Sequence, residues 1–242
     1  MITVTYDAEK TIQRCIDSVI NQTFTHIEYI VVDGNSSDST KLIVENNGKY
    51  ISVFKSEPDR GIYDAMNKGL KLATGDIIGM LNADDYFAND EVLFKIAETF
   101  DRTGADMLYS DLDYVDHEGE VVRKWRSGEF SERNFNWGWM PPHPTFYVKR
   151  EYFEKYGLYD PLFGTAADYE LMLRFMYHTA VRVVYLNEVT VKMGVGGVSN
   201  SNYRNRVSAW ACDLRAMQRH ALFFPLFSLI LKPLRKIVQY YI

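Results

Sequence analysis

The chain has 242 residues, of which 47% are apolar and 24% charged, enough for one domain with a large core, with or without an appendage. Its net charge of -5 argues against nucleic acid as the main partner, because phosphate binding needs a basic face. The two cysteines lack the spacing of a metal site, and the apolar helical pattern around Cys15 favours a buried, reduced thiol in a cytosolic protein. We see no signal-peptide pattern and no run of the about 20 apolar residues that span a bilayer.

Strands and helices are predicted to alternate along the first hundred residues. Apolar runs predict four strands, at residues 2–6, 27–33, 51–57 and 76–82. A helix is expected after each strand; in the first, Ile12, Ile16 and Val19 share one face at helical spacing. This alternation predicts βαβ units and an α/β fold with a right-handed, mostly parallel sheet.

The pattern changes after residue 105. The segments DMLYSDLDYVD and VVRKWRSG flank the residues HEGE, which predicts an antiparallel hairpin added to the sheet. Two helices, at residues 150–156 and 166–178, then precede a last strand, VRVVYLNEVTV. Because no internal repeat or low-complexity linker occurs, we expect one domain over residues 1–200 and a helical C-terminal tail over residues 201–242.

Polar or acidic residues stand at the end of each of the first four predicted strands. In chain order these are Thr5 and Tyr6, Asp33, residues 57–60 and residues 82–85. Ligands of open parallel sheets bind in the crevice outside the carboxyl ends of the strands. Four such strand ends therefore predict one binding site.

The residue types at this edge favour a nucleotide diphosphate. Asp33 can accept hydrogen bonds from the imide of a base or from a ribose, and Arg60 can bind a diphosphate with two parallel hydrogen bonds. Asp84 and Asp85 are hard oxygen ligands that suit Mg²⁺ or Mn²⁺ bound between the carboxylates and substrate phosphates. Neither a P-loop motif nor a dinucleotide-binding glycine motif follows the first strand.

Four segments carry a family resemblance, in the family's order and at its spacing: TVTYDAEKTIQRCIDSVINQTF, IEYIVVDGNSSDST, SEPDRGIYDAMNKGLKLATGDIIGMLNADD and AADYELMLR. Together they resemble family 2 glycosyltransferases with the GT-A fold, a Rossmann-like sheet flanked by helices. The resemblance covers residues 1–200. It implies an inverting enzyme that moves a sugar from a nucleotide diphosphate sugar, usually with a divalent metal. Bacterial members commonly build exopolysaccharide or lipopolysaccharide O-antigen.

The resemblance also assigns donor-binding positions. Those matching the nucleoside site are Thr5, Tyr6 and Asp33, and those in the segment beside the diphosphate and sugar are Asp59, Arg60 and Asn67. The family's D-x-D position is occupied by Asn82-Ala83-Asp84, so Asn82 replaces the first aspartate. An amide oxygen coordinates a metal weakly or binds ribose. We therefore expect Asp84 and Asp85 to hold Mg²⁺ or Mn²⁺ with modest affinity, and Asn82 and Asp84 to contact the donor.

Asp168 matches the family's catalytic base, which takes the proton of the acceptor hydroxyl during inversion. Ala167 stands where a glutamate is frequent in the family. From spacing alone, Asp168 is equally well read as an N-terminal cap or dipole partner of its helix. The Q-x-x-R-W sequence of processive synthases is absent, which fits transfer of a single sugar.

Three further features have two readings each. His143, between prolines, is structural or contacts the sugar or acceptor. Trp137 and Trp139 stack on a sugar ring or fill the core. The glycine-rich segment 193–202 is a mobile lid over the donor, which we favour, or a turn.

The tail combines an apolar segment with basic residues. Residues 221–231 are almost all apolar, and Lys232, Arg235 and Lys236 follow. The apolar run is too short to span a bilayer, but apolar plus basic is typical of an interfacial helix attracted to anionic lipid. The alternative is a helix packed on the domain.

Taken together, the sequence predicts a metal-dependent, inverting hexosyltransferase that uses a nucleotide diphosphate sugar, with UDP favoured by Asp33 and Tyr6. The acceptor is expected to be a saccharide or lipid-linked saccharide in cell-surface polysaccharide synthesis, at the inner face of the cytoplasmic membrane. One alternative is a catalytically weak nucleotide-sugar-binding subunit of a polysaccharide assembly complex, suggested by Asn82 and by Ala167. A nucleotidyltransferase is a weaker alternative, because TYDAEKTIQ is not its glycine-rich, basic loop.

Overall fold

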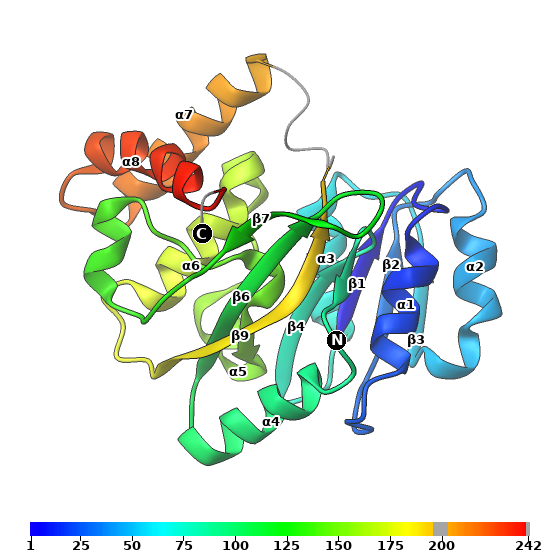
Figure 1. Cartoon of the computed structure of the whole chain (residues 1–242). Helices are drawn as coiled ribbons and strands as arrows, with labels where there is room; N and C mark the ends of the chain where they lie inside the picture. The colour runs from blue at the N-terminus through cyan, green and yellow to red at the C-terminus, as the bar shows by residue number, and fades with distance from the viewer. Residues whose placement is uncertain (196–202, 241–242) are drawn as a thin grey trace.

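The computed structural model of the chain describes residues 1–195 and 203–240. Its strands are β1 (Ile2–Thr5), β2 (Ile30–Asp33), β3 (Val53–Ser56), β4 (Ile77–Asn82), β5 (Asp85–Phe87), β6 (Met107–Val115), β7 (Val121–Trp125), β8 (Tyr147–Lys149) and β9 (Val183–Gly194). They form one sheet in the order β3-β2-β1-β4-β8-β6-β9-β5, with β7 paired to β6 (Figure 1).

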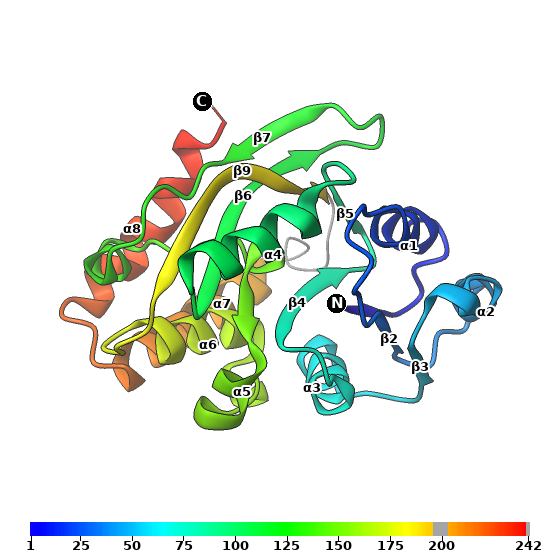
Figure 2. The same cartoon turned by 90° about the horizontal axis from the view of Figure 1, so that it is seen from below.

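Helices cover both faces of this sheet (Figure 2). The α-helices are α1 (Ile12–Ile20), α2 (Thr40–Asn46), α3 (Ile62–Leu72), α4 (Val92–Thr103), α5 (Arg150–Tyr156), α6 (Ala167–Met176), α7 (Tyr203–Arg219) and α8 (Pro225–Val238). Short 3₁₀ turns are η1 (Gly48–Tyr50), η2 (Glu132–Trp137), η3 (His143–Thr145) and η4 (Pro161–Ala166).

The predicted parallel half of the sheet is confirmed. β1 lies between β2 and β4, and β2 pairs with β3, all in parallel. Every residue of β1 and β2 is buried, as expected of strands covered on both faces. The predicted helix face is also confirmed, because Ile12, Ile16 and Val19 of α1 are fully buried.

The second half of the sheet is mixed. The predicted hairpin is confirmed as β6 and β7, and β9 runs parallel to β6. Two strands were not predicted: β8 inserts antiparallel between β4 and β6, and β5 pairs antiparallel with β9. Each has three residues, too few to show a period of two, so the sequence gives no signal for them.

Two apolar clusters lie on opposite faces of the sheet. One contains Met66 and Leu70 of α3 together with most of α6, and the other packs α1 and α4 against Val31 and Leu81. α3 and α6 thus cover one face and α1 and α4 the other.

The C-terminal tail packs on the domain through one side. Ala216, Met217 and Leu222 join the apolar cluster that contains α6. α8 crosses directly over Gly138, where an added Cβ would lie 2.5 Å from the backbone nitrogen of Lys232. The predicted lid covers residues 193–202, and its residues 196–202 lie outside the described part of the chain.

Candidate active site

The carboxyl ends of β1, β2, β3 and β4 meet at one edge of the sheet, the upper edge in Figure 1. Strand pairing places Thr5 opposite Asp33, Asp33 opposite Ser56 and Val4 opposite Asn82. The predicted strand-end residues Thr5, Asp33 and Asn82 are therefore neighbours along this edge.

Asp33 is fully buried and is held by two serines. Its Oδ2 accepts a hydrogen bond from the Ser36 backbone N–H at 3.1 Å and from the Ser56 hydroxyl at 2.6 Å, and the Ser36 hydroxyl bonds Oδ1. A base or ribose that binds Asp33 would therefore share it with, or displace, a serine hydroxyl. Beside it, the buried Thr5 Oγ1 has no partner among the described residues and could accept or donate one hydrogen bond.

An exposed ring and a carboxylate flank Gly34. A Cβ on this residue would lie 2.5 Å from Asp59 Oδ2 and 3.1 Å from Tyr6 Cδ2, so only glycine allows both side chains to approach the β2 end. Tyr6 is 65% exposed and presents an open aromatic surface at this point. Tyr6 and Asp59, 53 positions apart in the sequence, are thus brought together as the prediction requires.

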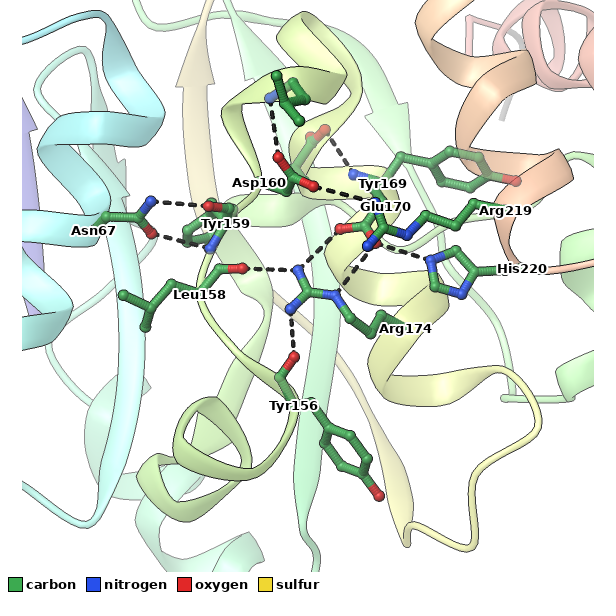
Figure 3. Close-up of polar contacts among 12 residues, drawn as sticks. Asn67, Tyr156, Leu158, Tyr159, Asp160, Tyr169, Glu170, Arg174, Arg219 and His220 are labelled. Carbon is green, nitrogen blue, oxygen red and sulfur yellow. Dashed lines mark hydrogen bonds and ion pairs between the residues drawn. The ribbon is translucent and has the colours of Figure 1, made fainter.

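The start of α3 presents Arg60 to solvent. The Asp59 carboxylate accepts a hydrogen bond from the Gly61 backbone N–H at 2.8 Å and fixes this turn. Asn67, about two helical turns after Arg60, exchanges two hydrogen bonds of 2.9 Å with the backbone of Tyr159 (Figure 3). Its amide group is therefore occupied by the protein, and Asn67 holds α3 to the segment that precedes η4.

The two adjacent aspartates differ in their surroundings. Asp84 lies in the turn between β4 and β5 and is half-buried, whereas Asp85 is fully buried. The Asn82 amide donates a hydrogen bond to Asp85 Oδ2 at 3.0 Å. Asn82 Oδ1 and Asp85 Oδ1 are both buried and have no partner among the described residues. Asp84 is therefore the carboxylate that a ligand in the crevice can reach more easily.

The electrostatics of this pair suit a cation. Burial raises the pKa of Asp85 well above its usual value, and the charge of Asp84 adds to the effect. Burial also raises the pKa of Asp84, opposed by the guanidinium of Arg14. Two orphaned oxygens and two carboxyl groups with raised pKa values are a donor set that a divalent ion would satisfy.

Within residues 1–195 and 203–240, no cluster of three or more His, Cys, Asp or Glu side chains has the arrangement of a metal site. Mg²⁺ and its analogues are commonly held by one or two carboxylates, with phosphates and water as the other ligands. Asp84 and Asp85 fit that mode of binding.

Asp168 lies in the first turn of α6 and is half-buried. The helix cap is Ala166, so Asp168 is not the capping residue that its spacing allowed. Its Oδ1 accepts a hydrogen bond from the Tyr169 backbone N–H at 2.7 Å. The helix dipole favours a carboxylate here, so the dipole reading and the base reading are compatible.

The charge of Asp168 acts on three neighbouring ring side chains. Burial and the Asp168 charge raise the pKa of Tyr63 well above its usual value, and burial and the same charge raise that of Tyr159. The Tyr159 hydroxyl lies 2.7 Å from Nε2 of His143, whose pKa is lowered by burial against the opposing charge of Asp168. Because Tyr63 is three residues after Arg60, Asp168 lies beside the segment predicted to bind the diphosphate.

A buried ion network fixes the helix that carries Asp168 (Figure 3). Glu170 is fully buried and accepts hydrogen bonds from Arg174, at 2.9 Å from Nη2, and from His220 Nε2 at 2.9 Å. Arg174 also donates to the Leu158 carbonyl at 2.8 Å. Sequence reasoning missed this network, although Glu170 and Arg174 stand at the i, i+4 spacing of a helical ion pair.

The two tryptophans have different environments. Trp139 is 3% exposed, and its indole N–H donates to the Ser127 carbonyl at 2.8 Å, so the core reading is confirmed for it. Trp137 is exposed and packs edge-on against Phe227 of α8, with ring centroids 5.6 Å apart. Trp139 is thus a core residue, and Trp137 belongs to the contact between η2 and α8.

The fold and this site define a glycosyltransferase of the GT-A class, and the chain belongs to glycosyl transferase family 2, whose model matches residues 1–167. A PGL/p-HBAD biosynthesis glycosyltransferase of Mycobacterium bovis (strain BCG / Pasteur 1173P2) is 26% identical over 218 residues, covering 83% of this chain and 78% of the relative. An uncharacterized glycosyltransferase of Mycobacterium tuberculosis (strain CDC 1551 / Oshkosh) is 30% identical over 190 residues, covering 72% of this chain and 67% of the relative.

Solved structures share the fold. TarS 1-349 of S. aureus in complex with UDP-GlcNAc has a TM-score of 0.70 at 22% identity and covers 99% of this chain and 77% of its own. The mannosyltransferase PcManGT of Pyrobaculum calidifontis in complex with GDP-Man and Mn²⁺ has a TM-score of 0.67 at 17% identity, covering 95% and 68%. In the comparison with another structure of S. aureus TarS 1-349, this chain spans 63% of the length of the TarS chain.

Proposed function

We propose that this glycosyltransferase transfers one hexose, with inversion, from a nucleotide diphosphate sugar to an acceptor hydroxyl, with the help of Mg²⁺ or Mn²⁺. The observation that carries this proposal is the convergence of Thr5, Asp33 and Asn82 at one sheet edge, together with Asp168 of α6 beside Tyr63 at the start of α3. UDP is the favoured nucleotide, because Asp33 can pair with an imide and Tyr6 offers a face for a base.

The chemistry needs one base and a stabilised leaving group. Asp168 would accept the proton of the acceptor hydroxyl while its oxygen forms a bond to the anomeric carbon from the side opposite the diphosphate. The bond from that carbon to the diphosphate oxygen breaks, and the diphosphate leaves with the electron pair. Arg60 would bind the departing phosphates, and a divalent ion held by Asp84 and Asp85 would neutralise their charge.

The acceptor in this proposal is a saccharide or lipid-linked saccharide used in cell-surface polysaccharide synthesis, at the inner face of the cytoplasmic membrane. The support is the kind of protein to which the chain is similar: relatives include a PGL/p-HBAD biosynthesis glycosyltransferase and, over 48% of this chain, a chondroitin synthase of Escherichia coli.

The direct test uses the purified full chain with labelled nucleotide sugars, in Mn²⁺, in Mg²⁺ and in a chelator. A preceding screen measures which nucleoside diphosphates raise the melting temperature, because a ligand that binds only the folded state stabilises it. We expect UDP to give the largest shift, and we expect metal-dependent transfer of the sugar to an acceptor or, slowly, to water. Failure of every UDP-sugar with success of a GDP-sugar would overturn the choice of nucleotide alone.

A second function is favoured by one observation. The Asn82 amide is committed to Asp85, and Ala167 offers no second carboxylate before Asp168. A nucleotide-sugar-binding subunit with weak catalysis would have these features. Tight, metal-dependent donor binding without transfer to any saccharide acceptor would support that function instead.

A further inference from the structure

An apolar surface of the tail is largely exposed in the described part of the chain. Each of its large apolar side chains is at least 46% exposed; they are Phe223, Phe224, Leu226, Phe227, Ile230, Leu234, Ile237, Val238 and Tyr240. Figure 1 shows α8 at the periphery of the molecule. Exposed apolar side chains that gather in this way mark an interaction site more often than chance placement does.

These side chains follow the geometry of α8. At about 100° per residue, the six exposed apolar residues of the helix fall within an arc of about 120°. We call this arc the outer face of α8; it consists of Leu226, Phe227, Ile230, Leu234, Ile237 and Val238. Arg235 projects from one side of this arc, where it would meet lipid headgroups if the outer face entered a bilayer surface. Lys236 lies toward Lys232 on the inner side of the helix, and burial lowers its pKa.

The opposite side of α8 is fixed to the protein by specific contacts. Ser228 is fully buried, and its hydroxyl donates to the Asn136 carbonyl at 2.7 Å. Lys232 forms an ion pair of 2.6 Å with Asp213 of α7 and lies 3.7 Å from the ring centroid of Tyr169. These contacts hold the outer face away from the domain, so its exposure is part of the folded structure.

The positive charge of the tail favours anionic lipid as the occupant of the outer face. Residues 203–242 contain seven lysines and arginines but a single acidic residue, Asp213, although the whole chain has 27 basic and 32 acidic residues. Lys232 is paired with Asp213 and Arg219 with Asp160, and the tail keeps a net positive charge after these pairs are counted. Basic side chains beside an apolar stripe attract anionic lipid, each contributing about 1 kcal/mol. A second copy that docked through its own outer face would bring the same positive charge and be repelled. The helix has 14 residues, a length of about 21 Å, and therefore lies on a bilayer surface instead of crossing its core of about 30 Å.

We infer that the outer face of α8 docks on an anionic membrane surface, with Phe223 and Phe224 entering beside it. This inference deepens the proposed function by naming the surface that presents the acceptor, and it rests on that function only for the acceptor. α7 and α8 contact α6 through Glu170 and Tyr169, so docking would set the distance between the membrane and Asp168.

The test is co-sedimentation of the full chain with vesicles of phosphatidylcholine and phosphatidylglycerol in equal parts, and with vesicles of phosphatidylcholine alone. We expect binding to the anionic vesicles at low salt and release at high salt. The double variant Leu226→Ser and Ile230→Ser should lose at least about tenfold in partitioning, because two buried apolar side chains are removed from the lipid. Arg235→Gln should lose about fivefold on anionic vesicles, because it removes one charge beside the outer face.

Matched controls come from other surfaces of the protein. Leu42→Ser with Phe94→Ser removes two side chains that are 58% and 51% exposed on α2 and α4, and Lys49→Gln with Lys71→Gln removes two exposed charges. Both controls should bind vesicles like the unchanged chain.

Two results would overturn the inference: no binding to anionic vesicles at low salt, or equal loss in the control variants. Dimerisation that disappears in the Leu226→Ser and Ile230→Ser variant, without vesicle binding, would assign the face to a second copy instead. Because vesicle binding is measured without donor or acceptor, its failure leaves the proposed sugar transfer untouched.

Discussion

Asp84 shows how one residue at the end of a strand acquires a role through its surroundings. It is the half-exposed member of an acidic pair whose other member is buried, and burial raises the pKa of both. Two carboxylates in this position repel each other unless a cation lies beside them. If Asp84 binds a ligand, its substitution should remove ligand binding. If Asp84 supports the fold, its substitution should lower the stability of the protein.

Asp84→Ala should abolish metal-dependent binding of the nucleotide and sugar transfer while leaving the melting temperature of the metal-free protein unchanged or slightly raised. The reason is that the variant loses a cation ligand and also a like charge beside Asp85. Calorimetric titration with UDP in Mn²⁺ and a thermal melt in chelator measure the two effects. Normal turnover in the variant would remove Asp84 from the site.

His143 should make the stability of the fold depend on pH. Its pKa is lowered by burial, so below the ordinary His value of about 6.5 the unfolded chain binds a proton that the folded chain resists. Stability is therefore full above that value and falls as the pH drops toward the lowered pKa. Urea titrations at several pH values should show a smaller acid loss for His143→Gln, which can still bond the Tyr159 hydroxyl. An unchanged slope would mean that other groups dominate.

At the scale of elements, α6 is the part that links the site to the tail. Asp168 lies in the first turn of α6, Glu170 and Arg174 follow further along the helix, and α7 and α8 pack against it. A buried carboxylate that is paired with Arg174 and hydrogen-bonded to His220 keeps the helix in one register, because any shift would leave a buried charge unpaired.

Glu170→Gln should destabilise the protein by about 3–5 kcal/mol, because it leaves Arg174 without its buried counter-charge. The matched control is Glu154→Gln, which removes an exposed i, i+4 partner of Arg150 and should have little effect. Urea unfolding of the two variants provides the comparison. Equal losses would show that the Glu170 network does not support the fold.

Gly138→Ala should loosen α8 from the domain. A Cβ there would meet the α8 backbone at 2.5 Å, whereas one at Gly128, which has a similar positive φ of 70°, would meet nothing within 4 Å. Gly128→Ala therefore reports the strain of the left-handed conformation alone, about 1–2 kcal/mol. We expect a larger loss for Gly138→Ala, together with faster proteolysis of the tail; equal behaviour would contradict the close packing of α8.

At the scale of the whole molecule, sequence reasoning reached the sheet's parallel half, its hairpin and the edge where Thr5, Asp33 and Asn82 come together. Apolar periodicity over runs such as IIGML made this possible. It could not reach β5 and β8, which are too short to be periodic, or the clamp between Asn67 and Tyr159, whose partners are 92 residues apart. Asp168 was singled out by family resemblance, because its own spacing fits a helix start equally well. The apolar pattern of the tail could be predicted from the sequence. Only the fold shows which side of α8 is covered by the protein.

The central claim is that this molecule transfers a sugar with Asp168 as the base. The measurement that tests it most directly compares Asp168→Asn with the unchanged chain for two quantities, the affinity for the donor nucleotide sugar and the single-turnover rate of sugar transfer to an acceptor. The substitution preserves shape and a hydrogen-bonding oxygen but removes the proton acceptor. We predict a fall in rate of at least about 10²-fold at unchanged donor affinity. A variant whose donor affinity collapses while bound donor reacts at the original rate would contradict the account.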